Sequence, residues 1–522
     1  MARYKGYDYS QGKFIPIHFE KQILPGTFEY TLHYIIDNEM DLSIFDARYQ
    51  NDETGAPAYD PAILLKIILY AYSRGITSSR KIEQCCRENI IFMALSADTR
   101  PHFTTIADFI STLDQEMIKF FLQVLLVCDE MGLIGKEMFA LDGCKMPSNA
   151  SKEWSGTKED LHKKKDKMEQ AIRQIVKRHR EIDVKEQDKG IVDQEEKYVE
   201  TIKKKIKKIK EWLKDNDDKP GKLGKPIKSN ITDNESAKMK TSHGVIQGYN
   251  GVAVVDEKHQ VVVHAEAFGS AQEHDLFEPM VKGTRENFEA IGKQEVFKTA
   301  KLVADSGFHT ENNMKMLMEE RIDGYVADTQ FRKRDPRFAE VDRYKERFRK
   351  ERAEYYGTSK LYRAKDFAMS EDKTHCICPA GKRLYRNGSN VIVDGNKAIK
   401  FRGRKTDCRV CEFREKCLRH PDRTETRQVY FFVGRSETAI ETYTQKMKRK
   451  IDSIKGRLIY NRRLGTSEPP FAHIRSIMGL DRFTLRGKRK VNTQWLMYCI
   501  VHNLLKVHRY GLGFCMSGTR IV

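Results

Sequence analysis

Two aspartates in this sequence follow short apolar segments. Asp142 comes directly after residues 138–141, and Asp305 ends the segment KLVAD at 301–305. In an open α/β sheet, ligand sites gather at the C-terminal ends of strands, so neighbouring strands would bring the two carboxylates together. Close carboxylates repel unless a proton or a cation lies between them, and oxygen ligands favour Mg²⁺ or Mn²⁺ over softer metals. The alternative is that each aspartate forms a turn or caps a helix.

A third acidic residue, Glu468, lies in the segment YNRRLGTSEPPFAHIR at residues 460–475. Ser467 can cap a helix whose first turn tolerates the two prolines that follow Glu468. Glu468 and Arg475 are then two helical turns apart and face the same side. Directed at the two aspartates, this carboxylate and this cation would form a metal site with a phosphate-binding group. A surface ion pair is the alternative.

The charge of the chain favours a polyanionic partner. Its 522 residues hold 94 Lys or Arg against 74 Asp or Glu, a net charge of +20. Residues 446–490 alone hold 14 basic against 3 acidic residues, which is more than half of the excess. We therefore expect this region to bind a phosphodiester backbone and to lose affinity steeply as salt increases.

The sequence predicts neither a membrane span nor a secretory leader. The N-terminal residues have no apolar core, and residues 495–507 are interrupted by polar side chains, as in an amphipathic helix. Of eleven cysteines, five lie within 42 residues and the others are scattered, which favours a reducing compartment over a disulfide framework. We expect a cytoplasmic protein, associated with the nucleoid when it is bound to DNA.

The clustered cysteines have the spacing of metal ligands. Cys408 and Cys411 form a C-x2-C pair, Cys417 follows, and Cys378 lies upstream. These four thiolates could bind a structural zinc ion in the manner of a zinc ribbon, and Cys376 or His420 could replace one ligand. An iron–sulfur cluster and free buried thiols are the alternatives. A zinc ion closed in by four thiolates would hold the segment folded and would take no part in catalysis.

The elements that must position these residues change along the chain. The first 130 residues are mostly helical, with a helix from Pro61 and others near 79 and 104, which suits a helix-turn-helix module or any small helical bundle. Residues 158–215 are highly charged and hold two heptad runs with Gly190 between them, which predicts an antiparallel hairpin with arms of roughly 35 Å. Its seven lysines between 203 and 214 form a solvated face, a DNA contact or an oligomer arm.

The second half of the chain is predicted to form a sheet and then helices. From 244 onward two strands are followed by alternating helices and strands, the pattern of a mixed α/β sheet. Residues 331–435 are basic and read as irregular, and helices are expected near 437–459, 467–478 and 492–509.

In their order and spacing, these motifs resemble the DDE transposases of bacterial insertion sequences, and more narrowly the group with a helical N-terminal domain and a cysteine-bearing insert. The resemblance covers nearly the whole chain. The segments that carry it are YDPAILLKIILYAYSRGITSSRKIE, LDGCKMPSNAS, TDNESAKMK, GYNGVAVVD, LVADSGF, CPAGKRLYRN, CRVCEFREKC, GTSEPPFAHIR and HNLLK.

The resemblance implies roles for the residues singled out above. Asp142, Asp305 and Glu468 would be the catalytic triad that binds two Mg²⁺ or Mn²⁺ ions, and the basic residue after the glutamate would be Arg475. Related transposases have a Tyr, two residues, an Arg, three residues and then the Glu. Here four residues separate Arg463 from Glu468. The resemblance assigns contacts with DNA phosphates to Tyr460, Arg462, Arg463 and Arg475.

The implied architecture is an RNase H-like mixed sheet flanked by helices and interrupted twice. Its expected parts are a helical DNA-binding domain at 1–130, the catalytic core at 131–157 and 230–330, a charged hairpin at 158–215, a cysteine-bearing insert at 331–435, and closing helices at 436–522. The expected partners are double-stranded DNA, both terminal inverted repeats and target, with a dimer or larger assembly on DNA.

Three other functions fit parts of the sequence. An RNase H-like nuclease would hydrolyse DNA with the same metal chemistry but without strand transfer. A domesticated DNA-binding protein would have lost catalysis, although it would not need three carboxylates within a basic surface. A zinc-dependent regulator would use only the N-terminal helices and the cysteine-bearing insert.

Overall fold

The chain forms two compact units, which are described separately. One consists of Met1–Ala327 and Ile454–Val522, and the other of Asp328–Ser453. The computed structural model describes residues 16–49, 57–182, 189–221, 224, 226–242, 244–335, 361–388, 391–393, 396–435 and 441–511.

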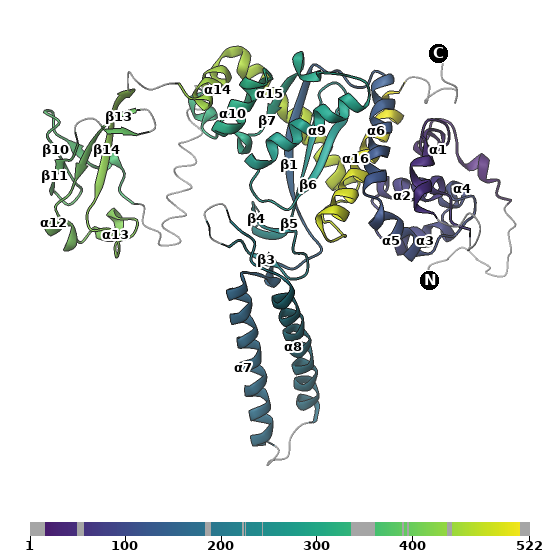
Figure 1. Ribbon diagram of the computed structural model, residues 1–522, viewed down its shortest axis with the longest axis horizontal. Helices are drawn as coiled ribbons and strands as arrows, with labels where there is room; N and C mark the ends of the chain where they lie inside the picture. Colours follow the sequence, from purple (N-terminus) through teal and green to yellow (C-terminus); the bar gives the residue numbers. More distant parts are fainter. Residues whose placement is uncertain are drawn as a thin grey trace, which may run out of the picture. The chain divides into compact units, whose positions relative to one another are not determined.

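Helices fill the N-terminal part of the first unit, as predicted (Figure 1). The helix predicted from Pro61 begins there because the Asp60 side chain accepts a hydrogen bond from the Ala62 N–H, 2.7 Å away, and proline suits a first turn. The helices of this part are α1 (Phe28–Asn38), α2 (Pro61–Ser73), α3 (Ser79–Glu88), α4 (Ile90–Leu95), α5 (Phe103–Thr112) and α6 (Gln115–Glu130). The short α4 was not predicted as a separate helix.

A six-stranded mixed sheet forms the centre of the first unit and confirms the predicted α/β class. Its order is β4-β5-β1-β7-β8, with β6 also paired to β5. Strand β1 is antiparallel to β5 and parallel to β7, which is parallel to β8. The strands are β1 (Met138–Pro147), β4 (Ala237–Thr241), β5 (Gly244–Asp256), β6 (Val262–Phe268), β7 (Lys301–Ala304) and β8 (Asp323–Val326).

Strand β1 is longer than the predicted strand at 138–141. Beyond the last residue paired with β7, it continues along β5 to the pair Pro147↔Gly248. Gly248 permits this approach, because a Cβ there would lie 2.0 Å from the Met146 carbonyl oxygen. Asp142 therefore lies within a strand and not at its end.

Helix α16 (Lys488–Tyr510) joins the sheet to the N-terminal helices (Figure 1). Its Asn503 side chain accepts from the Val262 N–H and donates to the Val262 carbonyl, both at 2.8 Å, and so pairs backbone groups of β6. On another side, Tyr498 stacks on Tyr72 with ring centroids 4.6 Å apart. Helices α9 (Phe277–Ala290) and α10 (Glu311–Glu319) follow β6 and β7.

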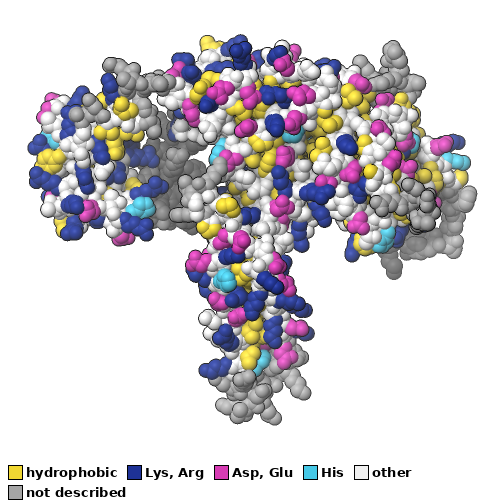
Figure 2. Space-filling model, viewed as in Figure 1, with side chains coloured by type: hydrophobic (Ala, Val, Ile, Leu, Met, Phe, Trp, Pro, Cys, Tyr) yellow, Lys and Arg dark blue, Asp and Glu magenta, His cyan; other side chains and the backbone are white. Residues whose placement is uncertain are grey.

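The charged segment forms the predicted helical hairpin (Figure 1). Its arms are α7 (Lys158–Ile182) and α8 (Lys189–Asp215). Gly190, which lies between the two heptad runs of the sequence, is the second residue of α8. The base is held by β2 (Ser155–Gly156) paired with β3 (Ser229–Asn230) and by a small core of Leu161, Ile209, Trp212 and Ile231. Figure 2 shows basic and acidic side chains intermixed on the hairpin.

The helix predicted to begin at Ser467 begins much earlier. Helix α15 (Ile454–Ala472) runs continuously through Pro469 and Pro470 and ends in a π-helical turn (His473–Ile477). Pro469 cannot donate to the carbonyl of Gly465, four residues before it. That carbonyl accepts a hydrogen bond from Gln260 Nε2 at 2.9 Å instead, so the helix continues.

The second unit is more ordered than its sequence indicated. Within its described residues the segment expected to be irregular forms an antiparallel sheet in the order β12-β13-β11-β10-β9, with β14 on β13. Its core contains Phe367, Cys376, Leu384, Ile399, Phe401 and Val429. The elements are β9 (Ala368–Met369), β10 (His375–Ile377), β11 (Arg383–Arg386), β12 (Val391–Val393), β13 (Asn396–Arg402), β14 (Gln428–Arg435), α12 (Lys405–Arg409), α13 (Arg414–Cys417) and α14 (Tyr443–Asp452).

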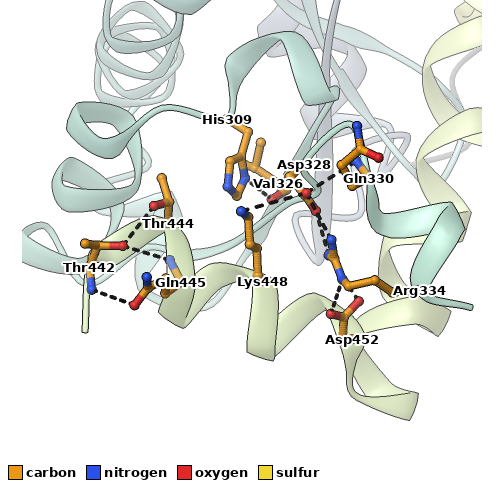
Figure 3. A network of polar contacts seen from close by, with 10 residues as sticks. All are labelled: His309, Val326, Asp328, Gln330, Arg334, Thr442, Thr444, Gln445, Lys448 and Asp452. Carbon is orange, nitrogen blue, oxygen red and sulfur yellow. Dashed lines mark hydrogen bonds and ion pairs between the residues drawn. The ribbon is translucent and has the colours of Figure 1, made fainter. Parts of the chain in front are cut away.

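An ion-pair cluster closes the second unit at its two chain ends. Arg334 contacts Asp328 and also Asp452 at the end of α14, as Figure 3 shows. The two aspartates are far apart in sequence, so this arginine ties the beginning of the unit to its last helix.

Across the described residues, no helix has both the length and the apolar composition required to cross a membrane.

Candidate active site

The register of the central sheet places two of the predicted carboxylates side by side. Leu141 of β1 pairs with Ala304 of β7, and the residue that follows each of them in the sequence is an aspartate. Asp142 continues in β1, whereas Asp305 leaves β7 and precedes a short turn at Ser306–Phe308. Asp142 thus lies at the point where β1 extends beyond the last residue that pairs with β7.

Helix α15 brings a cation to both carboxylates. Arg463 Nη1 lies 2.7 Å from Asp142 Oδ2, and Arg463 Nη2 lies 3.2 Å from Asp305 Oδ1. One turn later, the Ser467 hydroxyl donates to the same Asp142 oxygen at 2.9 Å. The other oxygen of Asp142 accepts from the Gly143 N–H at 2.8 Å. The Arg463 side chain is only 9% exposed, and its contact with Asp142 is more shielded from solvent than its contact with Asp305, whose side chain is 37% exposed.

The electrostatics of this cluster are unbalanced. Burial raises the pKa of Asp142 above its usual value, although Arg463, Ser467 and the Gly143 N–H favour its charged form, and the charge of Asp305 raises it further. Burial disfavours the charge of Arg463, but the two aspartates outweigh it and raise the pKa of the guanidinium. Burial raises the pKa of the adjacent Tyr460 to about 12, so this phenol is neutral. One cation faces two carboxylates, which leaves a net negative charge in a sheltered place.

Glu468 lies beside this cluster, in a hollow of about 520 Å³ that we call the carboxylate hollow. Its walls include Asp142, Cys144, Glu468, Arg475 and Asp481. Glu468 is exposed to this space, whereas Arg463 and Ser467, on the adjoining face of α15, are buried. The hollow is large enough for a phosphate group with its sugar.

Arg475 reaches the hollow from the π-helical turn and acts on Cys144. The thiol of Cys144 lies on the same face of β1 as Asp142, two residues earlier. Burial raises the pKa of Cys144, and the charge and hydrogen bond of Arg475 oppose that shift. Arg475 thus provides a positive charge in the lining of the hollow that also contains Asp142, Glu468 and Asp481.

The structure brings most, but not all, of the predicted site residues together. Tyr460 and Arg463 lie with the two aspartates, and Glu468 and Arg475 line the same hollow as Asp142. Arg462 is instead paired with Glu257. Sequence reasoning missed Cys144, Asp481 and the hydrogen bond of Ser467. Alternation along β1 could have indicated Cys144, and the four-residue spacing of Arg463 and Ser467 could have indicated their common face.

The acidic residues are of the type that binds a divalent cation, but their side chains are not arranged around a common point. Asp142 and Asp305 offer the oxygen ligands that Mg²⁺ and Mn²⁺ prefer. However, Arg463 bridges them, and Glu468 opens into the hollow. Within the part of the chain that the structure describes, no group of three or more His, Cys, Asp or Glu is arranged to hold a metal ion.

In the second unit, the four cysteines predicted as zinc ligands line one small cavity. Cys378, Cys408, Cys411 and Cys417 share this space of about 30 Å³ with several arginines. Burial raises the pKa of Cys417 to about 11, and the other three thiols contribute to that shift, which places all four near one another. The Lys382 N–H donates to Cys378 Sγ at 3.3 Å.

The two other candidate ligands lie elsewhere. Cys376 is buried in the hydrophobic core of the second sheet, and His420 is not among the residues that line the cavity.

Comparison with known families gives two matches. Residues 377–508 match a family described as "Transposase DDE domain", and residues 17–112 match one described as "Transposase domain (DUF772)". The first match includes Glu468, and neither includes Asp142 or Asp305. A search of curated proteins gave no match. Together the two family matches support the assignment of the chain to the DDE transposases of insertion sequences.

Proposed function

We propose that this insertion-sequence DDE transposase cleaves DNA at the ends of its element and joins the exposed 3′ ends to target DNA. One observation carries the proposal: Asp142 and Asp305 lie side by side in a sheltered site, next to a hollow that Glu468 and Arg475 line. A site with excess negative charge that is partly desolvated is expected of a cation-dependent reaction centre.

In this proposal Asp142, Asp305 and Glu468 hold Mg²⁺ or Mn²⁺. Two such ions supply activation of a water or 3′-hydroxyl nucleophile and stabilisation of the leaving oxygen. Arg463 and Ser467 fix the orientation of the Asp142 carboxylate. Arg475, which lines the hollow, would contact a phosphate directly, whereas Tyr460 is buried beside Arg463 and would act through that arginine. Arg462, paired with Glu257 and exposed, would contact the DNA backbone outside the hollow.

The rest of the chain has supporting roles in the proposal. The central mixed sheet, with β1 in its interior and helices packed on it, would be an RNase H-like core. The helices at 1–130 would recognise the terminal inverted repeats, because a compact helical module can place one helix in the major groove. Synapsis of two ends would require a dimer or larger assembly on DNA in the cytoplasm.

The test is a cleavage and strand-transfer assay on DNA that carries the element's own ends, with Mg²⁺ or Mn²⁺. Wild type is compared with Asp142→Ala, Asp305→Ala and Glu468→Ala. We expect wild type to expose and join 3′ ends, and each variant to bind DNA but do neither. Activity that survives the loss of any one carboxylate would refute the assigned site.

The same assay separates the other candidate functions. Cleavage without joining by the wild type would indicate an RNase H-like nuclease. DNA binding without any chemistry would indicate a domesticated binding protein.

We also propose that Cys378, Cys408, Cys411 and Cys417 bind one structural zinc ion. Support comes from their common cavity and from the N–H···S hydrogen bond at Cys378, since thiolates around a small space suit tetrahedral zinc. Metal analysis of the purified full chain should find one zinc per chain. The double variant Cys408→Ser/Cys411→Ser should lose it, and Cys376→Ser, outside the cavity, should keep it. Zinc-free wild type, or zinc retained in the double variant, would refute this site.

A further inference from the structure

We infer that a basic groove at the base of the helical hairpin is a second surface for the DNA backbone, distinct from the carboxylate hollow; this inference rests on the proposed function. The groove has a volume of about 500 Å³ and is open to solvent. We call it the basic groove. It is lined by Lys152, Trp154, Lys208, Gln247, Arg482 and Arg486, among others.

The charge of the basic groove has one sign. Lys152, Lys208, Arg482 and Arg486 are exposed at its walls. Among the described residues that line it, none is acidic. Four cations on one open surface repel one another unless an anion lies between them, so the groove fits an anionic ligand.

These cations come from segments far apart in the sequence. Lys152 begins the short 3-10 helix Lys152–Trp154 that follows β1, and Lys208 lies on α8. Arg482 and Arg486 lie in the segment before α16. The hairpin therefore contributes one wall, and the segment before the last helix contributes another. In Figure 1 the two hairpin arms leave the body of the unit beside β3.

The walls of the basic groove are held by specific contacts. Lys208 Nζ donates to Thr232 Oγ1 at 3.2 Å and lies 5.7 Å from the centre of the Trp154 ring. Arg486 Nε donates to the Asn149 carbonyl at 2.8 Å, and the Asn149 side chain donates to the Thr484 carbonyl at 2.9 Å. Lys208 and Arg486 are thus positioned before any ligand arrives.

The groove lies close to the proposed catalytic site. Asp481 lines the carboxylate hollow, and the next residue, Arg482, lines the basic groove. Strand β1 connects them as well, because Asp142 lies in its middle and its last residue, Pro147, lines the groove. Five strand residues span about 17 Å. That distance corresponds to about five base pairs of duplex at 3.4 Å each.

This geometry favours a phosphodiester backbone over a single phosphate. The groove is wide, its cations are spread over it, and it lies about half a helical turn of DNA from Asp142. Contacts of this kind position a duplex without reading its sequence. We therefore assign the basic groove to the DNA flank about five base pairs from the phosphate that is cut.

The test measures DNA binding in EDTA, so that it does not depend on catalysis. Fluorescence anisotropy follows a labelled duplex with the element's terminal sequence at several salt concentrations. The groove variant is Lys152→Gln/Lys208→Gln/Arg482→Gln, which leaves the hydrogen bond of Arg486 intact. A control with the same change of charge is Lys282→Gln/Lys298→Gln/Lys315→Gln, at exposed positions that line neither depression.

We expect the slope of log Kd against log salt to become shallower by about 2 to 3 in the groove variant, since each lost phosphate contact removes about 0.9. The control should keep the wild-type slope. Hydroxyl-radical footprinting should show protection lost about five base pairs from the cut and kept around it. If the triple variant melts below wild type, Arg482→Gln alone should reduce the slope by about 1.

Equal slopes for the groove variant and the control would overturn the inference, even if wild type binds and cleaves DNA. Unchanged DNA binding with a loss of self-association in the groove variant would also overturn it, because the groove would then hold an acidic segment of a second copy. A wild type that binds no DNA at all would instead refute the proposed function.

Discussion

Each of the two units contains an arginine between two aspartates, and the two clusters differ in geometry. In the second unit, Arg334 contacts both oxygens of Asp328, at 3.0 and 2.6 Å, and reaches Asp452 through Nε at 2.6 Å (Figure 3). In the first unit, Arg463 makes one contact with Asp142 at 2.7 Å and one with Asp305 at 3.2 Å. Arg334 is a third exposed, whereas Arg463 is nearly buried.

The carboxylates of the two clusters shift in opposite directions, because Asp142 is more deeply buried and Asp328 also faces a second cation, Lys448, at 3.9 Å. Burial acts to raise the pKa of Asp328, but the hydrogen bonds and charge of Arg334, the Gln330 N–H and the charge of Lys448 together outweigh it, and the pKa is lowered. At Asp142 burial dominates and the pKa is raised despite Arg463. The cluster around Arg334 is therefore a satisfied ion pair that stabilises its unit. In the cluster around Arg463, the negative charge of Asp142 is only partly compensated, as expected where another cation binds.

The largest expected difference between the clusters is in catalysis. Asp142→Asn keeps the shape of the side chain and removes its charge, so DNA cleavage should fall by at least about 10³-fold, on the order of 4 kcal/mol in the barrier. Asp328→Asn makes the same change in the other cluster and should leave the cleavage rate within about threefold. The measurement is single-turnover cleavage of an end-containing duplex. Equal losses in both variants would show that the clusters do not differ in function.

The second expected difference is in stability, and here the larger effect is expected from Asp328→Asn. Asp328→Asn should lower the free energy of unfolding of the second unit by about 2 kcal/mol, because charge-assisted hydrogen bonds are lost. Asp142→Asn should leave the first unit within about 1 kcal/mol of wild type or stabilise it, because it removes a poorly compensated buried charge.

Two methods separate the units in this experiment. All three tryptophans, Trp154, Trp212 and Trp495, belong to the first unit, so their fluorescence reports its unfolding. Hydrogen exchange of the amides in β13 and α14 reports the second. A loss of more than about 2 kcal/mol in Asp142→Asn would mean that Arg463 stabilises its cluster as well as Arg334 does.

Features set by local sequence were predictable, and those set by distant partners were not. The two aspartates were expected together because each follows a short apolar segment, although Asp142 lies within β1 and not at its end. The hairpin followed from its heptads, and α2 from its proline and the helical spacing of its apolar residues. Helix α15 was placed wrongly because prolines were taken to mark its first turn, whereas the carbonyl of Gly465, which Pro469 cannot bond, accepts from Gln260, 205 positions before Gly465.

Because the start of this helix was predicted wrongly, the directions of Arg462 and Arg463 could not be predicted either. With a helix assumed to begin at 467, nothing defined which way Arg462 and Arg463 point. In the structure they are neighbours on one helix, and only Arg463 faces the aspartates. The second sheet was missed for another reason. Strands such as β9 and β10 have two and three residues, too few for an alternating pattern.

A smaller difference is expected in the response to pH. The carboxyl of Asp328 has a lowered pKa in the folded state, so its contribution is complete above the unfolded pKa of about 3.9 and is lost as pH falls through the folded value. Asp142 has a raised pKa, so its charge costs stability at neutral pH and the cost disappears as pH falls through that value.

The variants make this pH dependence measurable. The stability gap between wild type and Asp142→Asn should close as pH falls from 7 toward 4. The gap between wild type and Asp328→Asn should persist to pH 4 and close only below it. Urea unfolding at several pH values, followed as above for each unit, gives both gaps. Gaps that close over the same pH range would contradict the opposite pKa shifts.

The smallest expected difference is in the response of stability to Mn²⁺. Free Mn²⁺ at five times its Kd stabilises the folded state by about 1 kcal/mol, which raises Tm by about 2 °C. We expect this rise, followed by tryptophan fluorescence, in wild type and in Asp328→Asn but not in Asp142→Asn. Arg463→Gln should show a larger rise, because the guanidinium no longer occupies the two aspartates. Mn²⁺ that stabilises Asp142→Asn as much as wild type would place the ion elsewhere, and the contrast between the two arginine clusters would then have no connection with metal binding.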